Sequence, residues 1–159
     1  MLRPVTPADT DAVVALTAGT GFFKPMELDT LWEVLDDYHA GNADLGHRSF
    51  LWEENGEPLG YVYHAPADMT DRTWYLYWIA VSKAAQGRGL GGKLLAFVEQ
   101  DVRGQDGRLL LIETSSTPHY EPTRKFYLKH GYAQAAHIPD FYADGDGLVV
   151  FSKRMQPSV

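Results

Sequence analysis

The sequence contains no cysteine. This excludes a disulfide framework, a zinc-thiolate centre and a cysteine nucleophile. No apolar run reaches the roughly eighteen residues that a membrane helix requires, and residues 1–11 do not combine a basic segment with an apolar one. We therefore expect neither a membrane span nor a secretory signal, and a cytoplasmic location is the default expectation.

The sequence has few positively charged residues: 14 lysine and arginine residues, compared with 21 aspartate and glutamate residues. The formal net charge of −7 provides no basic face for broad nucleic-acid binding, so no nucleic-acid partner is expected. A cationic substrate such as an amine is compatible with this balance, although an acidic surface also serves solubility alone. The six histidines are dispersed without metal-site spacing, and no metal is expected.

The chain does have the apolar content of a folded protein, with 45% apolar and 13% aromatic residues among 159. We expect one domain over residues 1–159, without repeats or a dividing linker. Apolar periodicity and turn residues predict helices over 9–18, 26–40, 90–102 and 122–130, and strands near the N-terminus and over 47–54, 59–65, 74–81, 109–114, 132–136 and 147–155. The continuous apolar run 109–114 suits a central strand covered on both faces. The fold class is α/β or α+β, with a mixed central sheet of about six to seven strands and helices on both faces.

Four glycines, Gly87, Gly89, Gly91 and Gly92, lie where the strand 74–81 gives way to the next helix. Glycine is entropically unfavourable there unless the backbone needs it. The first turn of a helix has unpaired amides and a partial positive charge, and glycines let these amides approach an anion closely. Arg88 and Lys93 add positive charge, so the segment favours pyrophosphate binding.

Other glycine-rich loops fit less well. A P-loop needs Ser or Thr after its lysine, whereas Leu94 follows Lys93. Gly87, Gly89 and Gly92 match the dinucleotide fingerprint, but they follow three antiparallel-looking strands, and no acidic residue ends a second strand about twenty residues further on. A nucleotide-cofactor oxidoreductase and a glycine-rich connection without a ligand stay open as alternatives.

Gln86, Gly89 and Gly91 form Q-x-x-G-x-G after the strand "WIAV", and a second block, "RKFYLKHGY", follows at 124–132. Together these motifs resemble the GNAT superfamily of N-acetyltransferases, and with the strand order the resemblance covers nearly the whole chain. It implies the GNAT fold, acetyl-CoA as cosubstrate, and direct acetyl transfer in a ternary complex to a primary amine of a small metabolite or a peptide N-terminus. A non-catalytic acyl-CoA binding regulatory module is the alternative function. Homodimers are common among proteins with this resemblance, so a homodimer is a candidate assembly. No feature of the sequence specifies it.

The resemblance also implies roles for individual residues. Strand residues 79–81 would contact the pantetheine arm, with the amide of Val81 facing the thioester carbonyl, and the amides of 86–92 would hold the pyrophosphate. The implied cofactor-binding residues are Ile79, Ala80, Val81, Gln86, Gly87, Arg88, Gly89, Leu90, Gly91, Gly92 and Lys93.

Two catalytic residues are implied as well. Tyr127 matches the tyrosine that protonates the departing thiolate. Glu113 closes the strand "LLLIE" and resembles the glutamate base of ribosomal-protein N-terminal acetyltransferases; a water-relayed base, His119 and Tyr120 are the alternatives. The connection "TSSTPHYEP" replaces the usual shorter one that contains Asn, and Thr114, Ser115 or Ser116 would substitute for that Asn.

Overall fold

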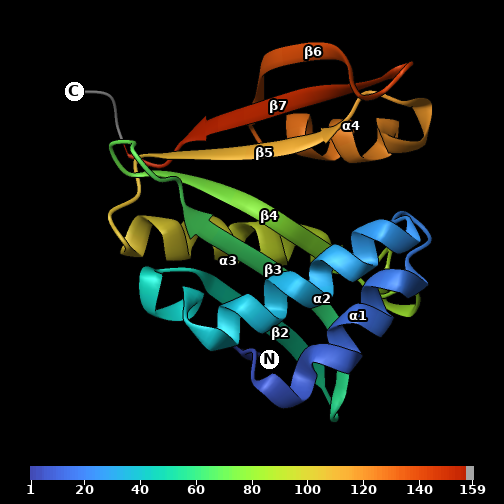
Figure 1. Ribbon diagram of the computed structural model, residues 1–159, viewed down its shortest axis with the longest axis vertical. Helices are drawn as coiled ribbons and strands as arrows, with labels where there is room; N and C mark the ends of the chain where they lie inside the picture. The colour runs from blue at the N-terminus through green and yellow to red at the C-terminus, as the bar shows by residue number, and fades with distance from the viewer. Residues whose placement is uncertain (157–159) are drawn as a thin grey trace. The chain divides into compact units, whose positions relative to one another are not determined.

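The computed structural model describes residues 1–156. Within this range the fold is a mixed sheet of seven strands accompanied by four α-helices, so the predicted fold class is confirmed (Figure 1). The strands are β1 (Leu2–Pro4), β2 (Arg48–Glu54), β3 (Glu57–Pro66), β4 (Thr73–Val81), β5 (Leu109–Ser115), β6 (Ala133–Ala143) and β7 (Asp146–Arg154). The helices are α1 (Thr10–Gly19), α2 (Pro25–Ala40), α3 (Leu90–Gly104) and α4 (Glu121–Lys129), with short 3-10 turns η1 (Pro7–Asp9), η2 (Asn42–Leu45), η3 (Lys83–Ala85) and η4 (Pro118–Tyr120).

The strand order in the sheet is β1-β2-β3-β4-β5-β7-β6. Strand β2 pairs antiparallel with both β1 and β3, and β7 pairs antiparallel with both β5 and β6, whereas β4 and β5 are parallel. The β2–β3 hairpin turns at Asn55 and Gly56, which both have positive φ, at 52° and 77°. That conformation is what the sequence Asn-Gly favours, and the predicted hairpin is confirmed.

Contacts divide the chain into two compact units, and the boundaries fall at the last residue of β3 and inside β4 and α3. The first unit comprises Met1–Ala65 and Trp78–Val98, and the second comprises Pro66–Tyr77 and Glu99–Val159. The expectation of a single domain over the whole chain stays a prediction. No helix in residues 1–156 has the length and hydropathy needed to cross a membrane.

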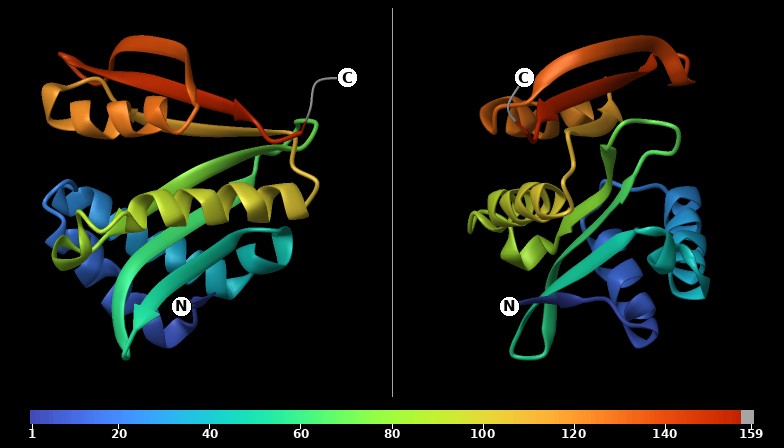
Figure 2. Two further views of the ribbon diagram at one scale, coloured as in Figure 1. Left: turned by 180° about the vertical axis from the view of Figure 1, so that it is seen from behind. Right: turned by 90° about the vertical axis from the view of Figure 1, so that its left-hand side faces the viewer.

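In the first unit, α1 and α2 lie on one side of the strands and the first half of α3 lies on the other (Figure 2). Leu31 and Leu35 lie one turn apart on α2 and are fully buried, as the helical spacing predicts. Gly60 of β3 permits a close approach of α3, because a Cβ there would lie 2.8 Å from Leu94 Cδ1. The core cluster comprises Val5, Val13, Leu31, Leu35, Leu51, Tyr61, Tyr63 and Ala65.

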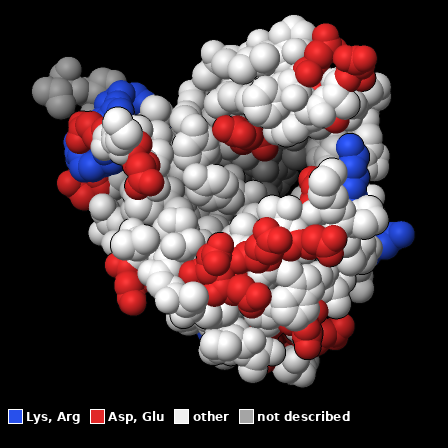
Figure 3. Space-filling view, in the orientation of Figure 1, with Lys and Arg blue, Asp and Glu red and all other residues white. Residues whose placement is uncertain are grey.

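The outer face of α2 is acidic. Asp and Glu side chains form a row over this helix in Figure 3. These side chains lie on the side of the helix that faces solvent, away from the buried leucines. A surface of this charge attracts cations and repels polyanions. That no nucleic acid binds stays a prediction. The acidic residues of the helix are Glu27, Asp29, Glu33, Asp36 and Asp37.

An ion-pair cluster fixes the N-terminal segment of the first unit. The guanidinium of Arg3 donates two hydrogen bonds of 2.8 Å to the two oxygens of Asp9 and a third of 2.8 Å to Glu53 on β2. The carboxylate of Asp9 also accepts the backbone amide of Thr6 at 2.7 Å. These interactions, that with Arg3 first, hold the pKa of Asp9 well below its usual range.

We expect Asp9→Asn to remove part of the pH dependence of stability. A depressed carboxyl pKa stabilises the folded state above the unfolded value of about 3.9, and this contribution is lost as the pH falls through the folded value. The variant should lose about 1–2 kcal/mol near pH 7, but its stability should converge with that of the wild type in strong acid. Urea titrations across this pH range measure the free energy of unfolding. If it fell equally with decreasing pH in the variant and in the wild type, the prediction would be contradicted.

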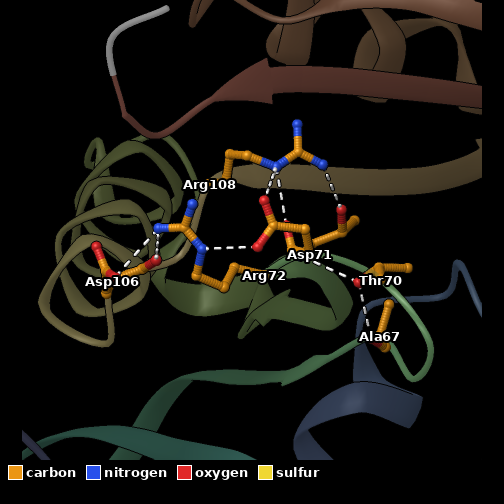
Figure 4. Close-up of polar contacts among 7 residues, drawn as sticks. Ala67, Thr70, Asp71, Arg72, Asp106 and Arg108 are labelled. Carbon is orange, nitrogen blue, oxygen red and sulfur yellow. Dashed lines mark hydrogen bonds and ion pairs between the residues drawn. The ribbon is translucent and has the colours of Figure 1, made fainter. Parts of the chain in front are cut away.

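In the second unit, the turn 67–72 fixes the start of the parallel pair β4–β5 (Figure 4). Arg108, at the entry to β5, donates from Nε to the backbone oxygen of Asp71 at 2.8 Å, and its amide donates to the oxygen of Arg72 at 2.8 Å. The guanidinium of Arg72 in turn pairs with Asp106 at 3.1 Å. Two arginines therefore hold the turn against the entry to β5, which sets the register Thr73–Leu109.

The two faces of the sheet in the second unit differ in how deeply their side chains are buried. Leu110, Ile112 and Phe151 are fully or almost fully buried on the face that contacts α4. On the other face Leu111 is half-buried and Glu113 is exposed. The prediction that both faces of the run 109–114 are covered is therefore wrong for one face, because an unbroken apolar run does not reveal which face lacks a cover.

Strand β6 forms the edge of the sheet and is longer than the predicted 132–136. All 11 of its residues are exposed, and its register with β7 shifts twice. Pro139 within the second irregular stretch has no amide hydrogen to offer another strand. Bulges and proline are the usual protection of an edge strand against unwanted pairing.

Candidate active site

In the glycine loop of the first unit, two of the four glycines have a left-handed backbone. Gly87 and Gly89 have φ values of 80° and 74°, which side-chain-bearing residues rarely adopt. The amide of Lys93 donates to the oxygen of Gly89 at 3.2 Å. The amides just before Lys93 are therefore the open ones at the start of α3. A Cβ on Gly87 or Gly89 would meet no atom within 4 Å, so open space lies beside the backbone of this loop.

Side chains on either side of the loop connect it to the strands. Gln86 donates from Nε2 to the backbone oxygen of Val81, the last residue of β4, at 3.3 Å. Arg88 is exposed and pairs with Glu54 at 3.1 Å, an interaction that lowers the pKa of Glu54. Leu90 is buried, so its side chain serves the core and only its backbone faces the helix start. The predicted cofactor residues thus all belong to the end of β4, this loop and the first turn of α3.

This loop fits a diphosphate group. Open amides at a helix start, two glycines in a left-handed conformation and the exposed guanidinium of Arg88 provide the donors that phosphate oxygens accept. Within residues 1–156 no group of three or more His, Asp or Glu side chains is arranged to hold a metal ion. The donors of the loop itself are N–H groups, which bind an anion.

The resemblance implies acetyl-CoA as the ligand of this loop, and Arg88 and Glu54 should then affect its affinity in opposite directions. We expect Arg88→Gln to raise the KM for acetyl-CoA about three- to tenfold, because it removes a cation beside the loop. Glu54→Gln should lower this KM about twofold, because it frees Arg88 from a competing carboxylate. Initial rates at several salt concentrations measure both effects, which should shrink as salt rises. Equal changes in the same direction would contradict a role of this ion pair.

In the second unit, Tyr127 lies on α4 and is 3% exposed. Its ring packs against those of Tyr132 and Phe151, at centroid distances of 5.9 and 5.6 Å. Burial raises its pKa well above the ordinary value, and no hydrogen-bond partner of its hydroxyl lies among the described residues. The phenol is therefore protonated at neutral pH, and its proton is not committed to a neighbour.

Glu113 lies on β5, where the pairing with β4 has just ended. The parallel register covers the four pairs from Thr73–Leu109 to Leu76–Ile112, and Glu113 is the next residue of β5 after the last of these pairs. Within residues 1–156 the carboxylate of Glu113 has no ion pair or hydrogen bond. An exposed, unpaired carboxylate at the point where two parallel strands part is well placed to accept a proton.

Glu113 and Tyr127 approach the sheet from opposite faces. Tyr127 contacts Phe151, which is opposite Ile112 in the register, and Glu113 is the next residue after Ile112. Because successive strand residues point to opposite faces, the carboxylate projects away from the face that α4 covers. A proton acceptor and a proton donor thus belong to the two sides of one strand.

The proposed substitutes for the missing asparagine are largely occupied. The hydroxyl of Ser115 donates to Asp146 at 2.5 Å and accepts the amide of Thr117 at 3.0 Å. The hydroxyl of Ser116 accepts the amide of Gly147 at 2.8 Å, and Thr114 is 7% exposed. These groups hold the connection between β5 and α4, which leaves little hydroxyl capacity for a ligand. The alternative bases His119 and Tyr120 lie in η4, with their rings 5.3 Å apart.

Two features of the second unit were missed by the sequence reasoning. Arg124 donates from one nitrogen to the backbone oxygens of Ser115 and Thr117, both at 2.8 Å, and so attaches α4 to the end of β5. Glu99 is a buried carboxylate on α3 that binds Tyr132 and Lys153. The sequence could have predicted this, because Glu99 lies beside the apolar stripe of this helix, and a charged residue there needs partners.

Comparison with known proteins adds independent findings. Residues 17–132 match the profile of the acetyltransferase (GNAT) family. A crystal structure from Desulfovibrio desulfuricans, of a protein assigned to that family, superposes with a TM-score of 0.94 at 37% identity, covering 98% of this chain and 99% of that one. A search of the curated proteins found no match.

Two more distant structures share the fold alone. An aminoglycoside 6′-N-acetyltransferase complexed with coenzyme A gives a TM-score of 0.77 at 15% identity, covering 100% of this chain and 99% of that one. The ribosomal-protein-S18-alanine N-acetyltransferase from Escherichia coli gives 0.79 at 13% identity, covering 100% and 96%.

Proposed function

The chain belongs to the acetyltransferase (GNAT) family of N-acetyltransferases, and from this we propose that it transfers the acetyl group of acetyl-CoA to a primary amine by direct attack in a ternary complex. The acceptor would be a small metabolite or a peptide N-terminus. The observation that carries the proposal is the glycine loop, in which Gly87 and Gly89 adopt left-handed conformations before the open start of α3. The absence of cysteine removes the commonest acyl-enzyme route and favours direct transfer.

Binding of the cosubstrate is assigned to the first unit. The amides from Gln86 to Gly92 would hold the diphosphate, with Arg88 and Lys93 adding positive charge. The end of β4, Ile79–Val81, would contact the pantetheine arm, and the amide of Val81 would donate to the carbonyl oxygen on which negative charge develops. When bound, acetyl-CoA supplies an acetyl group activated as a thioester.

Proton transfer is assigned to the second unit. Glu113 would take the proton of the acceptor's ammonium group, which frees the nitrogen lone pair to form the bond to the acetyl carbon. Tyr127 Oη would deliver its proton to the sulfur as the carbon–sulfur bond breaks, and the nitrogen would release its second proton, by way of solvent, to restore the phenol as the amide forms. The raised pKa of Tyr127 supports this role, because a buried phenol stays protonated at neutral pH. The opposite faces from which Glu113 and Tyr127 approach β5 suit an amine that enters from one side while a thiol leaves on the other.

The proposal is tested by calorimetry with coenzyme A and by thiol release from acetyl-CoA over a panel of amines. We expect saturable coenzyme A binding, no binding of NAD, and thiol release that depends on an added amine. Binding of NAD without binding of coenzyme A would restore the oxidoreductase alternative. Binding of coenzyme A with no amine-dependent release over the whole panel would favour the non-catalytic regulatory module.

A further inference from the structure

One face of the second unit's sheet carries aromatic side chains that α4 does not cover. We define the tyrosine face by Tyr75, Tyr77, Leu111, Glu113 and Val150. The register places Tyr75 opposite Leu111 and Glu113 opposite Val150, and the alternation of strand residues puts Tyr77 on the side of Tyr75. Tyr77 is 53% exposed, and Tyr75, Leu111 and Val150 are half-buried.

The two tyrosines form one continuous aromatic surface. Their ring centroids lie 5.4 Å apart with an interplanar angle of 31°. They are successive same-face residues of β4, where β-strand geometry alone would accept smaller or polar side chains. Exposed aromatic surface of this kind often marks a binding site. The flat ring faces favour a ligand that has a flat apolar portion of its own.

Two carboxylates lie within electrostatic reach of Tyr77. The carboxylate of Glu113 lies at its rim without an ion-pair partner among residues 1–156, and Asp68 of the preceding turn lies close enough to act on Tyr77. Burial, Tyr75, Glu113 and Asp68, in this order, raise the pKa of Tyr77. The ring of Tyr77 is therefore neutral at physiological pH, and both its π-face and the nearby carboxylates attract a cation.

We propose that the tyrosine face selects the acceptor, and that the acceptor is a monocationic amine attached to a flat apolar group. The flat group lies on Tyr75 and Tyr77, and the ammonium group points to Glu113. The inference rests on the proposed function, because Glu113 is also the base assigned above. A polyamine or an aminoglycoside would need several carboxylates, whereas the tyrosine face itself carries one, Glu113, among apolar neighbours such as Leu111 and Val150. Asp68 lies outside this face, in the turn before β4. A short alkylamine would leave the rings unused.

The test compares phenethylamine with propylamine, which has the same charge but no ring, and with spermidine, which has several charges. We expect phenethylamine to have a kcat/KM about tenfold above that of the other two amines. Tyr77→Ala should remove this preference by raising the KM for phenethylamine about tenfold, with propylamine unchanged within about twofold. The KM for acetyl-CoA should not move. Tyr142→Ala is the matched control, because Tyr142 is a similarly exposed tyrosine (47%) on β6, outside the tyrosine face.

A preference for spermidine, or equal losses with phenethylamine and propylamine in Tyr77→Ala, would overturn the inference. Calorimetric titration of phenethylamine into the coenzyme A complex separates this outcome from failure of the proposed function. Binding that Tyr77→Ala weakens, without turnover of any amine, would support the tyrosine face and refute the catalytic proposal. Turnover of other amines without such binding would refute the tyrosine face alone.

Discussion

Replacing Tyr127 with phenylalanine is expected to lower kcat by about 10²–10⁴-fold. The change removes one oxygen atom, whose proton would otherwise neutralise the departing sulfur. The side chain is 3% exposed, its ring contacts involve the carbon skeleton, and no hydrogen-bond partner of the hydroxyl lies in residues 1–156, so the packing of α4 on Phe151 should be retained. Steady-state kinetics with a saturating amine, together with a urea titration, measure the two effects.

The control for this variant is Tyr61→Phe, which removes the hydroxyl of another fully buried tyrosine, in the core of the first unit. We expect kcat to change less than twofold in the control, and we expect coenzyme A to bind both variants as it binds the wild type. The raised pKa of Tyr127 adds a second expectation, because a phenol with a raised pKa remains a proton donor above its ordinary value of about 10. If activity fell as the pH rose just above neutrality, the cause would be deprotonation of a group other than Tyr127. A Tyr127→Phe variant with wild-type kcat would exclude Tyr127 as the acid.

The elements that the sequence predicts well are those specified by neighbouring residues. Asn55-Gly56 determines its hairpin because both residues readily adopt positive φ. The helix 26–40 follows from the spacing of Leu31 and Leu35, and it begins one residue earlier than predicted, at Pro25. Proline is favoured in the first turn of a helix, where its missing amide costs nothing. The glycine loop was predictable for the same reason, since its conformation depends on its own residues.

The features that could not be predicted depend on residues far apart in the chain. Ser115 donates to Asp146, 31 positions away, and this contact occupies a hydroxyl that the sequence offered as a ligand contact. The length of β6 was hidden because all of its residues are exposed, which leaves no apolar alternation to detect. Likewise, "LLLIE" does not show that Leu111 and Glu113 share a face that α4 leaves open. Such facts come from the pairing of strands, not from any single strand.

The buried carboxylate of Glu99 provides the largest expected effect on stability. Glu99 is 8% exposed; its Oε2 accepts the hydroxyl of Tyr132 at 2.7 Å, and Lys153 Nζ donates to its two oxygens at 3.0 and 3.1 Å. Lys153 also donates to the backbone oxygen of His130 at 3.0 Å, so its position is fixed near the end of α4. Glu99→Ala would leave Tyr132 without its acceptor and Lys153 without its carboxylate partner. We expect the free energy of unfolding to fall by about 3–5 kcal/mol, measured by urea denaturation.

Two further variants separate the loss of the pair from the loss of packing. Glu99→Gln keeps an acceptor for Tyr132 but removes the charge opposite Lys153, and we expect a smaller loss of about 1–3 kcal/mol. Glu99→Leu combined with Lys153→Met replaces both charges with apolar side chains and should recover most of the stability, because neither member of the pair is left behind. Arg103, which lies 3.9 Å from Glu99, is 44% exposed and keeps its contact with solvent. The cost in Glu99→Ala would then come chiefly from the ammonium group of Lys153 left without its partner. A double variant as unstable as Glu99→Ala would instead assign the effect to the lost hydrogen bond of Tyr132 and to the cavity beside it.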